Sequence, residues 1–182
     1  MFDIAKERPE DQAAIERLLD AAFGGSRHSK SSYRFRHGVA PVPELKLVAR
    51  ERHKPGGYGV IGTLRFWPVT IGAAGDPALL LGPLAVAADW RRMGVGAALM
   101  AEGLALAALA RHRIVVLVGD LPYYARFGFR PAAEFGIAIE DEQAARVLAR
   151  GLVPGAFAGV GGPVVPWRSV RRRGSVGRAV AA

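Results

Sequence analysis

The chain has 182 residues, 51% hydrophobic and 23% charged, which is enough for one compact domain with a sizeable core. It contains no cysteine, which excludes disulfides, thiolate metal sites and a thioester intermediate on the protein. The formal net charge of +9 suits an anionic partner. Five arginines lie within residues 168–182, so we expect a basic, disordered tail after a domain of residues 1–167.

The first 71 residues favour a strand, a helix and a hairpin. Residues 2–8 fit a short edge strand, and apolar residues recur at helical spacing through residues 9–23. Residues 26–38 form a polar, basic segment with room for a short helix. Strand patterns at residues 45–51 and 58–71 flank a glycine-containing turn and predict the hairpin.

A strand, a helix and a second strand follow. Residues 78–86 fit a central strand, which Gly82-Pro83 should bulge because proline cannot donate to a sheet ladder. Residues 94–112 fit a helix, and since only Glu102 is charged between residues 97 and 110, we expect it to be covered on several sides. Residues 114–118 fit a buried strand parallel to the first, with a ligand at the carboxyl ends of the pair.

The remaining elements are shorter. We expect a helix over residues 122–127, a strand over residues 134–139, a helix over residues 142–150 and a last strand before Trp167. Residues 151–157 fit a structural turn, with a wall of a substrate-binding pocket or a homodimer contact as alternatives. Neither a secretion segment nor a spanning apolar helix is evident, so we expect a cytoplasmic protein without a membrane partner.

The turn at residues 91–97 has the features of an anion site. Glycines let a ligand approach the main chain, the first amides of a helix lack intrahelical partners, and arginines add planar donor forks. A dinucleotide fingerprint would need Gly or Ala where the chain has Leu99, and no Gly-Lys-Ser or Gly-Lys-Thr of a triphosphate loop occurs. The turn therefore predicts seven binding residues, which are Arg91, Arg92, Met93, Gly94, Val95, Gly96 and Ala97.

Arg91-x-x-Gly94-x-Gly96-Ala97 resembles the acyl-CoA signature of the GNAT superfamily of N-acetyltransferases, and Tyr124-Ala-Arg-Phe-Gly-Phe129 resembles its second signature. Two signatures in the right order, about thirty residues apart, argue against chance. The resemblance extends more weakly over residues 1–167 and is closest to bacterial members. It implies an α/β fold with a mixed, largely antiparallel central sheet, a parallel strand pair splayed at the acyl-CoA site, and helices on both faces.

The resemblance also implies an activity. It is the direct transfer of an acetyl group from acetyl-CoA to a primary amine of a small molecule or peptide, within a ternary complex. Tyr124 matches the family's general acid, and the spacing to Gly128-Phe129 favours it over the adjacent Tyr123. Backbone groups at Leu84, Ala85 and Val86 would hold the pantetheine arm, while the turn at residues 91–97 holds the pyrophosphate.

The sequence leaves the general base open among Asp120, Glu44, Glu51, His28 and water. Asp120 follows the strand at residues 114–118, where sites in such sheets gather, but it could also cap the next helix. The four histidines lack the spacing of metal ligands, so we expect no metal site.

Two other classes of function stay open. The lack of an obvious base suits an acyl-CoA sensor or scaffold that does not catalyse. The net charge suits a nucleic-acid module, although the excess sits in a tail instead of a basic face interleaved with aromatic residues.

Overall fold

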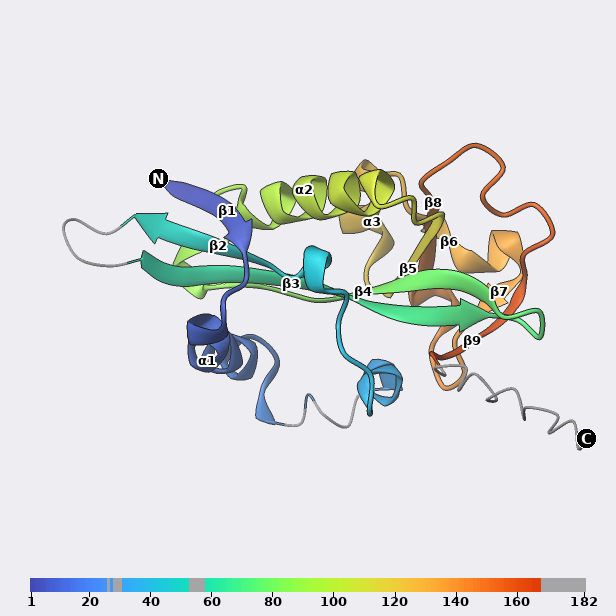
Figure 1. Ribbon diagram of the computed structural model, residues 1–182, viewed down its shortest axis with the longest axis horizontal. Helices are drawn as coiled ribbons and strands as arrows, with labels where there is room; N and C mark the ends of the chain where they lie inside the picture. Colours follow the sequence, from blue (N-terminus) through green and yellow to red (C-terminus); the bar gives the residue numbers. More distant parts are fainter. Residues whose placement is uncertain (26, 28–30, 53–57, 168–182) are drawn as a thin grey trace, which may run out of the picture.

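The computed structural model describes residues 1–25, 27, 31–52 and 58–167, and a mixed sheet organises them (Figure 1). Its strand order is β1 (Phe2–Lys6), β2 (Leu47–Arg52), β3 (Tyr58–Ile71), β4 (Asp76–Val86), β5 (Ile114–Val118), β8 (Val147–Gly151) and β6 (Arg130–Pro131). Neighbours in this order are antiparallel, except that β4 and β5 are parallel. β9 (Gly162–Pro166) pairs with the end of β3 and with β7 (Ile137–Ala138). The mixed, largely antiparallel sheet is confirmed.

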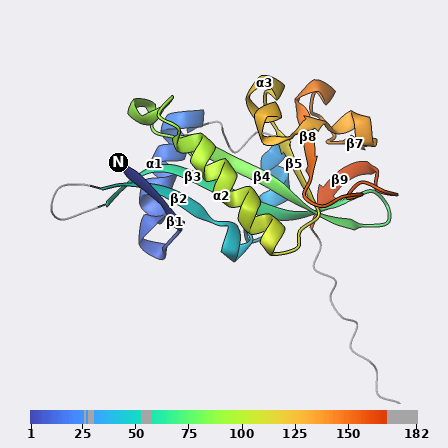
Figure 2. The same ribbon diagram turned by 90° about the horizontal axis from the view of Figure 1, so that it is seen from above.

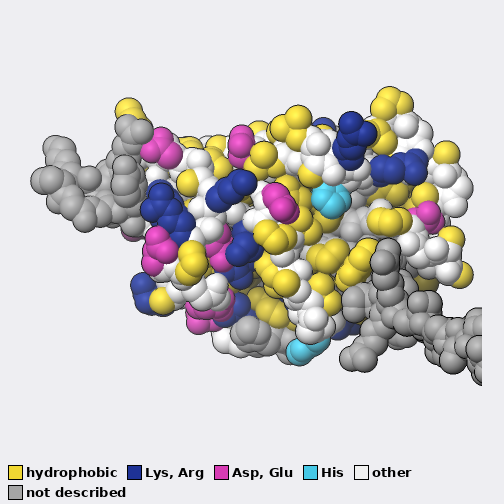
Figure 3. All heavy atoms as spheres, viewed as in Figure 1, with side chains coloured by type: hydrophobic (Ala, Val, Ile, Leu, Met, Phe, Trp, Pro, Cys, Tyr) yellow, Lys and Arg dark blue, Asp and Glu magenta, His cyan; other side chains and the backbone are white. Residues whose placement is uncertain are grey.

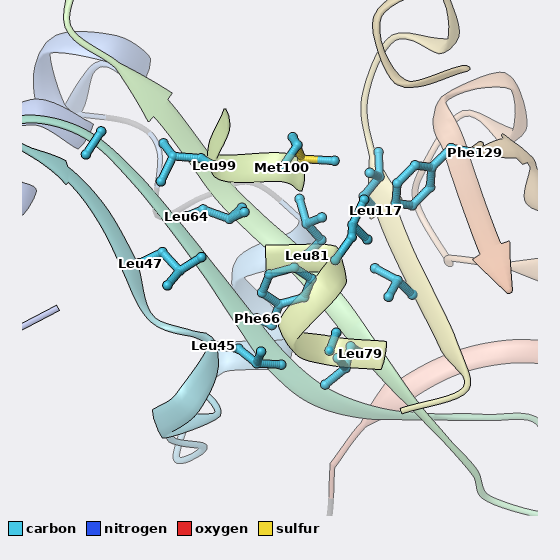
Figure 4. Close-up of a cluster of buried hydrophobic side chains, with 14 of the residues drawn as sticks. Leu45, Leu47, Leu64, Phe66, Leu79, Leu81, Leu99, Met100, Leu117 and Phe129 are labelled. Atoms are coloured by element: carbon cyan, nitrogen blue, oxygen red, sulfur yellow. The ribbon is translucent and has the colours of Figure 1, made fainter. Parts of the chain in front are cut away.

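Helices cover both faces of the sheet, as expected (Figures 1 and 2). α1 (Gln12–Phe23) buries Ile15 and Leu19 in a cluster with Val48 on one face. α2 (Val95–Leu109) buries Leu99 and Met100 on the other face, where they meet β3, β4 and β5 side chains (Figure 4).

Short helical turns connect these elements. They are η1 (Pro9–Asp11), η3 (Ser31–Arg36), η4 (Pro43–Leu45), η5 (Ala88–Trp90), α3 (Leu121–Tyr124), η6 (Ala125–Phe127), η7 (Ala132–Phe135) and η8 (Ala144–Arg146). The fully buried Phe129 joins the core beside Leu117, which fixes the segment that follows α3 (Figure 4).

β4 and β5 separate at the centre of the sheet. Their pairing covers Leu79 with Val115 and Leu80 with Val116, although β4 continues to Val86. The register of β4 against β3 shifts in the same region, which confirms the bulge expected at Gly82-Pro83. In an antiparallel pair, alternate residues direct their N–H and C=O away from the partner strand. The outer edge of β4 beyond Leu80 therefore presents backbone groups to the space between the strands.

Three expectations for the secondary structure were wrong. α2 is not covered on several sides: Leu109 is 79% exposed, and Ala101, Glu102, Ala105 and Ala108 are exposed as well. Alanine favours a helix and exposes little apolar area, so a helix rich in alanine can have one face in water.

The helix expected over residues 142–150 is instead η8 followed by strand β8. Val147, Leu148 and Ala149 are almost fully buried, and β8 pairs with β5 along its whole length. Pairing to β5 therefore outweighs the helix propensity of this segment. The strand expected over residues 134–139 is shorter, because η7 occupies its first part and Gly136, at φ 67°, separates η7 from β7.

Among the described helices, none combines the length and the apolar composition that a membrane crossing requires.

Candidate functional site

A pocket of about 960 Å³ opens where β4 and β5 separate. One side is residues 80–84 of β4, and the other is residues 118–120 at the end of β5 together with Tyr123 and Tyr124 of α3. The remaining wall consists of Phe23, Arg27, Tyr33, Arg34, Arg36, His37, Asp141, Glu142 and Arg146. Segments far apart in the sequence thus meet at the carboxyl ends of the parallel strands, where a ligand is expected.

The pocket brings together three of the residues predicted from the sequence: Leu84, Asp120 and Tyr124. The other predicted binding residues, which are Ala85, Val86, Arg91, Arg92, Met93, Gly94, Val95, Gly96 and Ala97, do not line it. Glu44 and Glu51, two candidates for the base, are absent from its walls as well. His28 lies outside the described residues.

Tyr124 is held by aromatic packing. Its ring makes edge-to-face contacts with Tyr123 at 4.9 Å and with Phe129 at 5.9 Å. The ring also lies so close to the backbone of Gly119 that any side chain there would overlap it. Burial, aided by Tyr123 and Asp120, raises the pKa of Tyr124 from 10 to about 12, against a smaller opposing effect of Arg146. The phenol is therefore protonated at neutral pH and can donate its proton.

Asp120 stands at the entrance to α3. Its side chain is 79% exposed and lies 3.5 Å from the Nε of Arg146. Its carbonyl accepts the backbone N–H of Tyr123, but its side chain makes no capping hydrogen bond. The carboxylate is therefore free of the capping role that the sequence left open.

The turn before α2 has the geometry of an anion site. Gly94 has φ 82°, in the left-handed region that favours glycine, and its carbonyl accepts the N–H of Ala98 at 2.9 Å. That bond is the first of the helix, so the amides of residues 95–97 have no intrahelical partner. Arg91 and Arg92 are exposed beside them and make no ion pair with a described carboxylate. The local charge is therefore positive.

Tyr123 connects this turn to the pocket. A Cβ placed on Gly96 would lie 2.8 Å from the hydroxyl oxygen of Tyr123 and 3.6 Å from Val86. The guanidinium of Arg126 stacks on the ring of Tyr123, with its Cζ 4.2 Å from the ring centroid. The amide end of α2 and the pocket are thus neighbours along the outer edge of β4.

Six charged residues in the pocket wall were not predicted individually. Arg27, Arg34 and Arg36 belong to the basic segment that the sequence marked only as a whole. Glu142 and Arg146 belong to the segment expected to be a helix, and Asp141 directly precedes it. Their positions depend on how β8 and η3 pack, and no local pattern records that. The basic composition of residues 26–38 was the one available signal.

Charges of both signs share the molecular surface. On the face drawn in Figure 3, Lys and Arg side chains alternate with Asp, Glu and hydrophobic side chains. That face gives no support to a nucleic-acid partner, and residues 168–182 lie outside the described residues. Within the described ranges, no three His, Asp or Glu side chains gather where they could share a metal ion.

Comparisons with known proteins define the class. Residues 46–131 match the model of the acetyltransferase (GNAT) domain. The uncharacterized N-acetyltransferase YjhQ of Escherichia coli is 30% identical over 125 residues, which cover 68% of this chain and 66% of that protein. The chain thus spans about two thirds of the length of this relative.

Solved structures of similar proteins point to the same class. The GNAT family N-acetyltransferase YhbS of Escherichia coli, in complex with CoA, superposes with a TM-score of 0.75 at 29% identity, over 90% of this chain and 88% of that chain. A GNAT family acetyltransferase from Brucella melitensis, in complex with acetyl-CoA, gives a TM-score of 0.64 at 30% identity, over 91% and 95% of the two chains. The chain belongs to the GNAT family of N-acetyltransferases.

Proposed function

We propose that the protein transfers an acetyl group from acetyl-CoA directly to a primary amine, with Tyr124 as the general acid. The observation that carries this proposal is the meeting of Leu84, Asp120 and Tyr124 in one pocket, beside the unpaired amides that begin α2. The CoA and acetyl-CoA named in the two related crystal structures support this donor. We assign the activity to a domain of residues 1–167 of a cytoplasmic bacterial protein.

Donor binding uses two parts of the chain. The pyrophosphate would lie on the amides of residues 95–97, with the forks of Arg91 and Arg92 above it. The pantetheine arm would run along the free edge of β4 at Leu84, Ala85 and Val86, where alternate amides point away from β3 and toward the thioester carbonyl. An amide aimed at that oxygen stabilises the negative charge that develops during attack.

The reaction then needs two proton transfers. The neutral amine attacks the thioester carbon, and the C–S bond breaks as the amide forms. The phenol of Tyr124 gives its proton to the departing thiolate, and the nitrogen loses a proton to Asp120, directly or through a water. Asp120 is the assigned base because it lies on the same wall as Tyr124, and because its contact with Arg146, at 3.5 Å, is longer than that of Asp141 with Arg34, at 3.1 Å.

Initial-rate kinetics tests this function. Thiol release from acetyl-CoA is measured while both acetyl-CoA and an amine are varied, and mass spectrometry identifies the acetylated amine. We expect intersecting double-reciprocal lines, because transfer without a covalent intermediate requires both substrates at once. Parallel lines together with an acetylated protein would contradict direct transfer. Tight acetyl-CoA binding without turnover for any amine would instead favour a sensor.

A further inference from the structure

The pocket wall facing the acyl-transfer residues is rich in arginine. Arg27, Arg34 and Arg36 come from the segment between α1 and β2, and all three line the pocket. The three guanidiniums differ in whether a carboxylate neutralises their charge, and this difference indicates which acceptor the pocket can bind.

Two of the three arginines already have anionic partners. Arg27 pairs with Glu16 and with Asp20, the latter at 2.8 Å. Arg34 pairs with Asp141 at 3.1 Å and donates to the carbonyl of Glu140 at 2.8 Å. These two guanidiniums therefore shape the wall and have little charge left for a ligand.

Arg36 has no such partner. Its guanidinium stacks on Tyr33 at 4.2 Å and lies 5.5 Å from the ring of Trp67, and its Nε is buried without a hydrogen bond. Among the described residues, no carboxylate lies within 4.0 Å of it. A cation removed from water without a counter-charge is unfavourable unless something else supplies one.

The same burial changes the acidity of Arg36. Removal from water, with smaller effects of Arg65 and Arg27, lowers the pKa of Arg36 to about 10 in spite of an opposing effect of Tyr33. The side chain still carries its positive charge at neutral pH. An anion entering the pocket would therefore meet a full, uncompensated charge held in place by two aromatic rings.

Arg36 lies on the acceptor side of the site. A Cβ placed on Gly82 would be 3.5 Å from its Nη2, and Trp67 fixes that part of β4 by donating to the Gly82 carbonyl at 2.7 Å. Leu84 is two residues further along β4, beyond the bulge at Gly82-Pro83, and it lines the same pocket as Arg36. Gly96 of the pyrophosphate turn adjoins Val86, two residues beyond. Arg36 and the pyrophosphate turn thus flank Leu84 on opposite sides.

We propose that the acceptor is a small primary amine that also carries an anionic group, a carboxylate or a phosphate, and that Arg36 binds this group. The inference rests on the proposed acetyl transfer. The planar fork of a guanidinium accepts two oxygens of either anion. Because Arg36 adjoins β4 at Gly82, two positions before Leu84, we expect a short carbon chain between the anionic group and the attacking nitrogen.

Matched pairs of amines test this inference. Thiol release from acetyl-CoA is compared for glycine and β-alanine against their amides, and for 2-aminoethyl phosphate against ethanolamine. We expect kcat/KM to be at least about tenfold higher for the anionic member of one set. The favoured set distinguishes a carboxylate from a phosphate. Transfer without preference in either set would overturn the inference and leave the proposed function standing. Transfer to other amines but to none of these would also overturn the inference alone, whereas absence of transfer to every amine tested would contradict the proposed function as well.

Variants of Arg36 add a second readout. Arg36→Gln should lower kcat/KM for the favoured anionic amine about 10- to 100-fold, while its neutral partner changes less than about threefold. Arg36→Lys keeps the charge and loses the fork, so its loss should be smaller. Arg17→Gln, at an exposed position of α1, is the matched control and should leave both rates unchanged.

The two Arg36 variants also separate recognition from folding. Acetyl-CoA affinity and circular dichroism should match the wild type, because Arg36 lies away from the pyrophosphate turn. An equal loss for the anionic and the neutral amine would mean that Arg36 only supports the wall, and would overturn the inference. If Arg36→Gln does not fold, Arg36→Lys and the wild-type preference carry the same test.

Discussion

The donor end and the acceptor end of the site are built in different ways. The donor end consists of β4, the turn at residues 91–97 and α2, which are consecutive in the chain. The acceptor end combines Phe23 of α1, the arginines around η3, and residues 141–146 before β8. One end is encoded locally, and the other forms only when distant segments pack.

This difference separates two kinds of recognition. Backbone amides and glycines bind the part of a donor that is the same for every acyl-CoA, and a short motif can specify them. Side chains on separately packed segments can change without disturbing that motif, so they can adapt one fold to different acceptors. A change at one end should therefore leave the other end nearly intact.

The largest effect is expected from a substitution that disturbs the acceptor end alone, by loosening the attachment of α1. Asp11 and Arg50 form a two-pronged buried pair, with contacts of 2.8 and 2.6 Å, and are only 4% and 8% exposed. Asp11→Asn removes the negative charge and leaves the buried Arg50 without its counter-charge. We expect the free energy of unfolding to fall by about 3–5 kcal/mol, measured by urea denaturation.

An exposed pair provides the control for Asp11→Asn. Arg8 and Glu10 are 3.9 Å apart and more than half exposed, so Glu10→Gln should change the stability by less than about 0.5 kcal/mol. In the folded fraction of Asp11→Asn, the KM for the amine should rise while the Kd of acetyl-CoA stays constant. An equal rise of both constants would mean that the two ends are not independent.

The next largest effect is expected at Tyr124, where the two ends meet. Tyr124→Phe should lower kcat about 10²- to 10³-fold, because the thiolate then leaves without its proton donor. Tyr123→Phe is the matched control and should change kcat less than about fivefold. Thiol release at saturating acetyl-CoA measures both. The opposite ranking would assign the acid to Tyr123, whose hydroxyl adjoins Gly96.

The donor end alone is tested at Arg92. Arg92→Glu should raise the Kd of acetyl-CoA about tenfold, measured by calorimetry at low salt, because a carboxylate then repels the pyrophosphate. Arg111→Glu is a matched control, since Arg111 is also exposed and also has a positive φ, but it lies at the far end of α2. Equal acetyl-CoA affinities for the two variants would mean that the turn at residues 91–97 does not bind the donor.

The contrast also explains what could be predicted from the sequence. The positions of β4, α2 and β5 and the splay between the strands followed from apolar runs, a Gly-Pro pair and two short signatures. β8 could not be predicted, because Val147, Leu148 and Ala149 suit a helix until β5 offers them a free edge. The isolation of Arg36 could not be predicted either, because it depends on which carboxylates Arg27 and Arg34 attract.

The smallest expected effect is the pH dependence of transfer. A tyrosine with its ordinary pKa of 10 would be half ionised at pH 10, and the rate would be halved. With its pKa raised to about 12, Tyr124 stays protonated, so kcat/KM expressed per neutral amine should be flat from pH 8 to pH 10. Spontaneous hydrolysis of acetyl-CoA is subtracted at each pH, and circular dichroism checks that the fold persists. A twofold decline by pH 10 in an intact protein would mean that burial does not raise the pKa of this phenol. In that case the acceptor wall would leave Tyr124 open to water.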